Sequence, residues 1–187
     1  MVQTFKSFVE DIWNNFPNLK EKEMTNITNY NYFWTLQQHV DKGYLNFETG
    51  RKYLYRLSVL LENYAVKNST PLLATFETEK RYKYVEERYQ EILEKIPKAW
   101  IIGDFKNAFL APNPPPSAEV ISCDGTNIAN MWIVLVKGPI GPFGLVAESL
   151  GEDLYRGFFS NGTTVMNKVV ERISDALKIK IDFSKKY

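Results

Sequence analysis

The segment from Trp132 to Gly157 constrains the fold of this chain more than any other. Two apolar runs, residues 131–137 and 144–148, are joined there by a short turn rich in glycine and proline. A third run, residues 156–159, follows. Short apolar runs bounded by such turns are typical of buried β-strands, and a tight turn leaves neighbouring strands antiparallel. The first two runs are therefore predicted to pair antiparallel in a sheet, and the segment carries no catalytic motif.

A strand–helix–strand pattern upstream predicts a parallel pair in the same sheet. The apolar run of residues 72–77 is followed by a helix that Thr78 can cap, and then by a second buried run at residues 99–103. A connection of this length crosses the sheet and returns the next strand parallel to the first. With a further strand at residues 119–123, we predict an α/β (α+β) fold, in which a single mixed sheet of about five to six strands is flanked by helices.

Apolar residues at helical spacing predict helices outside this central pattern. One covers residues 5–16, one runs from about residue 48 to 67 with Asn46 as its N-cap, and a last one covers residues 163–178. The apolar stripes of the helices and strands define a predicted core: Leu57, Leu61, Val134, Val136, Leu145, Val169 and Ile173.

The distribution of apolar and polar residues along the chain predicts three parts. Residues 1–46 are predicted to form an N-terminal helical extension or cap, and residues 47–178 an α/β domain. Residues 179–187 are expected to be a loosely held tail. The proline-rich stretch at residues 111–117 is predicted to be an ordered loop, with a polyproline ligand for another domain as the alternative.

Charge and composition narrow the classes of partner. Lys+Arg is 23 and Asp+Glu is 22, so no basic footprint for nucleic acid is present across the chain. The longest apolar run, residues 131–136, is far too short to cross a membrane. A single cysteine and the lack of a signal peptide predict a soluble cytoplasmic protein without disulfides.

Few residues of the chain are of the types that commonly act in catalysis or metal binding. His39 is the only histidine and Cys123 the only cysteine, and the chain has no metal-binding or phosphate-loop motif. We predict no metal, no catalytic residue and no cofactor from motifs. Thioether attachment of a chromophore to Cys123 is an open alternative to a small buried thiol.

Polar and aromatic residues near strand ends are the candidates for a ligand or partner site. Glu77 and Glu148 close predicted strands and Arg156 opens one, and ligands of α/β sheets bind at such ends. A salt bridge that ties strand ends together is the alternative. Six aromatic residues are candidates to line a pocket for a flat ligand, with plain core packing as the alternative: Phe76, Tyr82, Tyr84, Trp100, Trp132 and Phe158.

The segment of residues 61–173 resembles the DICT sensory domain, a family associated with bacterial diguanylate cyclases and two-component systems. The similar pieces are, in order, LENYA, PLLATFETEKRYKYVEERY, AWIIG, MWIVLVKGPIGPFGLVAES and YRGFFSNGTTVMNKVVERI. No single piece is diagnostic, and their ordered combination carries the resemblance.

This resemblance implies a sensory or regulatory module without established catalysis, linked to input sensing and, in some members, to light. We therefore expect a stand-alone signalling module that binds a small ligand or relays through a protein partner or self-association. The alternative is a protein-interaction or oligomerisation module with no small-molecule ligand. An exposed aromatic patch on the N-terminal helix, around Phe8 and Trp13, would favour that alternative.

Overall fold

The computed structural model describes residues 6–25, 33–104 and 116–187, and a single sheet of seven strands runs through its centre. The strand order is β1-β7-β6-β5-β2-β3-β4. The strands are β1 Tyr44–Gly50, β2 Leu72–Thr78, β3 Ala99–Asp104, β4 Ala118–Ser122, β5 Met131–Lys137, β6 Pro142–Gly151 and β7 Leu154–Ser160. The helices are α1 Phe8–Asn15, α2 Pro17–Lys20, α3 Leu36–Lys42, α4 Arg51–Asn68, α5 Glu79–Lys95 and α6 Thr163–Leu177.

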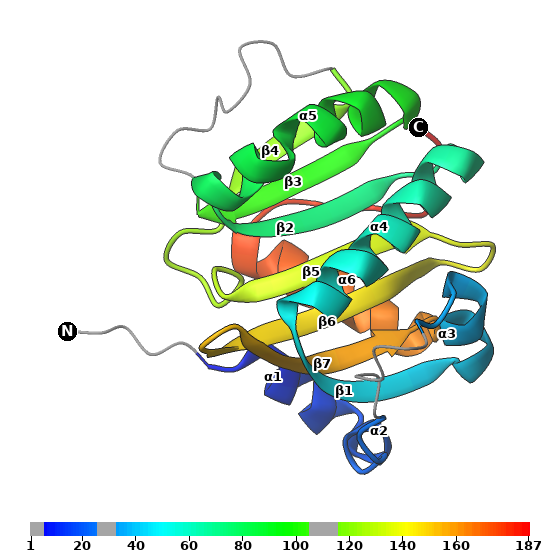
Figure 1. Ribbon diagram of the computed structural model, residues 1–187, viewed down its shortest axis with the longest axis vertical. Coiled ribbons are helices and arrows are strands. Elements are labelled where there is room, and N and C mark those ends of the chain that lie inside the picture. Colours follow the sequence, from blue (N-terminus) through cyan, green and yellow to red (C-terminus); the bar gives the residue numbers. More distant parts are fainter. Residues whose placement is uncertain (1–5, 26–32, 105–115) are drawn as a thin grey trace.

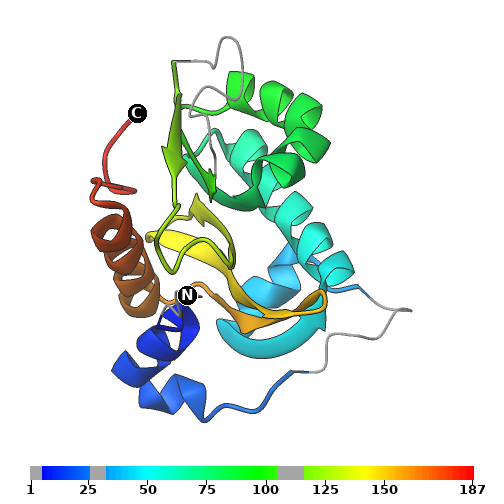
Figure 2. The ribbon, with the colours of Figure 1, turned by 90° about the vertical axis from the view of Figure 1, so that its left-hand side faces the viewer.

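Helices cover both faces of this sheet. Helices α4 and α5 cross one face, and α1 and α6 lie on the other (Figures 1 and 2). Each face has its own apolar core, with Leu61 and Val134 on the α4 side and Val169 and Ile173 on the α6 side. Within the described ranges, no helix is both long enough and apolar enough to cross a bilayer.

The predicted strand pairings are confirmed. Strands β2 and β3 are parallel, with Leu72 opposite Ala99, and β5 and β6 are antiparallel, with Val134 opposite Leu145. All residues of the predicted core are buried. The α+β class and the single mixed sheet are therefore confirmed, with seven strands in place of the expected five to six.

The additional strand is β1, which sequence reasoning assigned to a helix start. Asn46 lies in the middle of β1 and not at an N-cap, and helix α4 begins at Arg51 after Gly50. Strand β1 pairs antiparallel with β7, so the predicted domain limit at residue 46 falls inside a sheet strand. The polar residues of NFETG are typical of a helix start. They lie in a strand here because β1 runs directly into α4 without a connecting loop.

The C-terminal segment differs from the expected loose tail. Ile181 and Phe183 are buried, and the ring of Phe183 lies 5.0 Å from that of Trp100 in β3. These contacts cover the α6 side of β3. Most of the proline-rich stretch falls outside the described residues, as does Phe5 of the expected first helix.

The single histidine is a buried structural group. The ring of His39 in α3 contacts the Thr35 carbonyl oxygen through Nδ1 at 2.7 Å and the Tyr53 hydroxyl through Nε2. If Nδ1 carries the proton and donates to Thr35, then Nε2 accepts from Tyr53, so the neutral ring satisfies both contacts. Burial lowers the pKa of His39 below its ordinary value.

This burial predicts a specific pH dependence of stability. As the pH falls through about 6.5, His39 takes up a proton in the unfolded chain before it does so in the folded protein. Protonation therefore favours unfolding, and stability is lost as the pH falls. We expect urea midpoints between about pH 7.5 and pH 5.5 to drop further for the natural protein than for His39→Gln. Parallel pH curves for the two proteins would contradict this account of His39.

Candidate functional site

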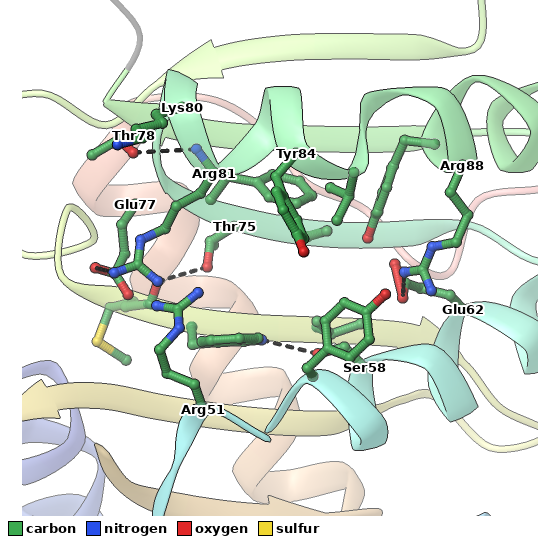
Figure 3. A pocket seen from close by; sticks show the side chains of 18 of the residues that line it. Arg51, Ser58, Glu62, Thr75, Glu77, Thr78, Lys80, Arg81, Tyr84 and Arg88 are labelled. Atoms are coloured by element: carbon green, nitrogen blue, oxygen red, sulfur yellow. Dashed lines mark hydrogen bonds and ion pairs between the residues drawn. The ribbon is translucent and has the colours of Figure 1, made fainter. Parts of the chain in front are cut away.

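A pocket lies between α4 and α5, on the sheet. Its volume is about 840 Å³, within the range of small-molecule sites. Strands β2 and β5 supply its floor, including Ala74, Phe76 and Trp132, and the two helices supply its walls. Figure 3 shows side chains from both helices and from β2 directed into this space.

One end of the pocket is closed by a buried ion pair between the helices. Glu62 of α4, with only 1% of its surface exposed, pairs with the Arg88 guanidinium of α5. The Tyr89 hydroxyl also hydrogen-bonds to the Glu62 carboxylate. Burial raises the pKa of Glu62, and the positive charge of Arg88 opposes that shift. The pair fixes the spacing of the two helices over the sheet.

The other end of the pocket is a cationic cluster around Glu77. The Tyr155 hydroxyl donates to Glu77, and Arg51 Nη1 donates to the Tyr155 oxygen at 3.1 Å. Arg81 Nη2 lies 3.7 Å from Glu77. Burial raises the pKa of Glu77, and the hydrogen bond from Tyr155 and the positive charge of Arg51 oppose that shift. The cationic side chains of Arg51, Lys80 and Arg81 outnumber the carboxylates of Glu77 and Asp153 at this end.

Of the aromatic candidates, Trp100 and Phe158 belong to the core on the opposite face of the sheet, and the others line the pocket or lie behind it. Trp132 donates from its indole nitrogen to Ser58 Oγ at 2.9 Å, and the Arg51 guanidinium sits over its ring, 5.0 Å from the centroid. Phe76 lines the pocket, whereas Tyr82 is buried and packs edge-on against Phe76. The structure thus brings Trp132 and Phe76 to one pocket with Glu77.

Glu148 and Arg156 do not join this group. They face each other across β6 and β7 and form an ion pair of 2.8 Å on the opposite face of the sheet, beneath α1. The hydroxyl of Ser7 donates to Glu148 at 2.8 Å, and Arg156 also pairs with Glu10 at 3.2 Å. The expectation that Glu77, Glu148 and Arg156 face one cavity is wrong, because strand alternation directs Glu148 and Arg156 away from α4 and α5.

These contacts attach the N-terminal helix to the sheet. Phe8, Ile12 and Trp13 of α1 are buried against that face, so the apolar side of the helix is covered within the chain. A smaller cavity of about 450 Å³ lies beside Glu148 and Ser7. The exposed aromatic patch that would favour an oligomerisation module is not found among the described residues of α1.

Sequence reasoning missed most of the charged residues of the pocket. Ser58 and Glu62 are four residues apart on the same side of α4 as the buried Leu54 and Leu61. Polar residues within an apolar helical stripe indicate that this side of the helix contacts a polar site as well as the apolar core. No comparable signal marks Arg51 and Arg81, because arginine near a helix start is common on solvated surfaces.

The single cysteine and the single histidine lie outside the pocket. Cys123 is buried on the α6 side of the sheet, and burial raises the pKa of its thiol to about 12. His39 is occupied by Thr35 and Tyr53. In the described part of the chain, no three His, Cys, Asp or Glu side chains lie together as a metal ion would require.

Comparisons with known proteins do not assign a family. No protein-family model, no curated protein and no solved structure matches the chain. The resemblance to the DICT domain therefore stays a prediction, and the geometry of the pocket carries the functional argument.

Proposed function

We propose that this protein is a non-catalytic sensory or regulatory module that binds a small molecule in the pocket between α4 and α5 and relays the binding to a protein partner. The pocket itself is the observation that carries the proposal. Its size suits a small organic ligand, and it combines an apolar floor with a few charged side chains, as ligand sites do.

Three of the five pieces that carry the DICT resemblance contribute residues to this pocket. LENYA contributes Glu62 from α4, and PLLATFETEKRYKYVEERY contributes Glu77 from β2 and Arg88 from α5. Trp132 belongs to MWIVLVK in β5. A sensory role for the pocket is consistent with that coincidence. Ligand binding between two helices also offers a way to change their spacing, which a partner can read.

Native mass spectrometry tests this proposal on protein purified from its own cells and mixed with their small-molecule extract. The natural protein is expected to carry a non-covalent ligand. Val85→Trp, which fills the pocket from α5, is expected to lose that ligand. Ile140→Trp, at an exposed turn outside this pocket, is the control and is expected to retain it. Equal ligand occupancy in the natural protein and in Val85→Trp, including none in either, would overturn the proposal.

A further inference from the structure

We infer that the ligand of this pocket is a small organic anion, with a carboxylate or phosphate group on a flat aromatic body. This inference rests on the proposed function and names the chemical class of the ligand. It is carried by the charges, the partners and the aromatic surface of the pocket.

The charges of the lining are unequal. Cationic side chains outnumber carboxylates there: Arg51, Lys52, Lys80, Arg81 and Arg88 against Glu62 and Glu77. Arg88 and Glu62 are paired with each other at the closed end. At the other end the cations Arg51, Lys80 and Arg81 lie near the carboxylates of Glu77 and Asp153, and the side chains of Arg51 and Arg81 point toward one another in Figure 3. An anionic group placed there would balance the excess positive charge.

One hydrogen-bond donor of the Arg81 guanidinium has no partner among the described residues. Its Nη2 is the nitrogen that lies near Glu77, whereas Nη1 is buried and has no hydrogen-bond partner in the described part of the chain. A buried donor without a partner costs free energy, and an oxygen of an anionic ligand would satisfy it. The planar guanidinium is suited to carboxylate and phosphate groups in particular.

The backbone adds to this positive potential. The first turns of both helices border the pocket, α4 through Arg51 and α5 through Arg81. A helix N-terminus carries partial positive charge, and Gly50 gives α4 no side-chain cap. The anionic group is therefore assigned to the end of the pocket where α4 and α5 begin.

The body of the ligand is assigned to the apolar floor of the pocket, beside the Trp132 ring that Arg51 covers. The floor there is formed by Trp132, Phe76 and Val134, and Tyr84 reaches over the pocket from α5 (Figure 3). Aromatic rings pack well against a flat partner in offset or edge-on geometry. A ligand whose ring lies on this floor can place its anionic group beside Arg51 and Arg81.

Two dyes that share a ring system test the inference. The anionic probe is 8-anilinonaphthalene-1-sulfonate, and the neutral probe is N-phenyl-1-naphthylamine, which lacks the sulfonate. We expect the natural protein to bind the anionic dye about tenfold more tightly, as one charge-assisted hydrogen bond provides. Arg81→Gln is expected to abolish this preference and to leave the neutral dye unaffected. Lys83→Gln removes the same charge from α5 outside the pocket and is expected to retain the preference.

Competition against the anionic dye distinguishes a carboxylate ligand from a phosphate ligand. The competitors are benzoate and phenyl phosphate, which share a phenyl ring and differ in the anionic group. Displacement by either compound supports the inference, and displacement by neither overturns it. Equal affinity for the two dyes, lost for both in Val85→Trp, would overturn the anion assignment and leave the pocket as a ligand site. Thermal unfolding of Arg81→Gln checks that the variant is folded, and Arg81→Lys, which keeps the charge, is expected to restore part of the preference.

Discussion

Replacing Gly157 with alanine is expected to destabilise the fold by about 3 kcal/mol or more. A Cβ atom at this position of β7 would lie 2.0 Å from the Val146 carbonyl oxygen and 2.6 Å from the Ala147 Cα. Both are backbone atoms of β6, so no side-chain rotation relieves the contact. Strand β7 lies between β1 and β6 and cannot shift without disturbing both pairings.

Urea unfolding followed by circular dichroism measures this effect. Gly50→Ala is the matched control, since the nearest atom to a Cβ there is the Asp153 carbonyl oxygen at 3.8 Å. We expect that control to cost less than about 1 kcal/mol, the size of an altered helix cap. A loss below about 1 kcal/mol for Gly157→Ala would show that β6 and β7 are not packed as described.

Removing Arg88 is expected to produce the second large loss of stability. Arg88→Met leaves the Glu62 carboxylate buried without its cation, and breaking a buried pair in this way costs several kcal/mol. Because 32% of the Arg88 side chain is exposed, we expect a loss of about 2–3 kcal/mol, toward the lower end of that range. Lys168→Met breaks the exposed pair with Glu171 and is expected to cost less than about 0.5 kcal/mol.

The loss in Arg88→Met should depend on pH. The pKa of Glu62 is already raised by burial, and without Arg88 it rises further. Between the ordinary glutamate pKa and this raised pKa, the folded state binds the proton more tightly than the unfolded chain does. The stability gained from that proton is present at low pH and is lost as the pH rises through this interval. The cost of Arg88→Met is therefore expected to be smaller at about pH 5 than at about pH 8, and an equal cost at both would contradict a buried Glu62.

Local sequence signals were sufficient for most of the sheet. Strands β2, β3, β5 and β6 are apolar runs bounded by turns or by a capped helix, and their pairings follow from the length of each connection. Strand β1 could not be predicted in the same way, because no turn separates it from α4: Gly50 is both the last residue of the strand and the N-cap of the helix. The alternation of Leu45, Phe47 and Thr49 was the available signal for it.

Less of the candidate site than of the fold could be predicted from the sequence. Glu77 was predicted as a candidate from its place at a strand end, and Phe76 and Trp132 as aromatic residues for a pocket; all three line this pocket. Arg51 and Arg81 were missed because their convergence depends on how α4 and α5 cross the sheet, which no local pattern encodes. Glu148 and Arg156 also lie near strand ends, but the alternation of strand faces separates them from Glu77.

The indole signals of the four tryptophans provide the most direct test that the pocket between α4 and α5 is a ligand site. Of these residues, Trp132 alone lines the pocket, whereas Trp13 and Trp100 belong to the core on the opposite face and Trp34 packs beside His39. The measurement is a titration of nitrogen-15-labelled protein with 8-anilinonaphthalene-1-sulfonate, with each indole signal assigned by a Trp→Phe variant. The proposed site predicts that the Trp132 signal shifts and saturates while those of Trp13 and Trp100 stay in place. A Trp132 signal that does not move while another indole signal does would contradict it.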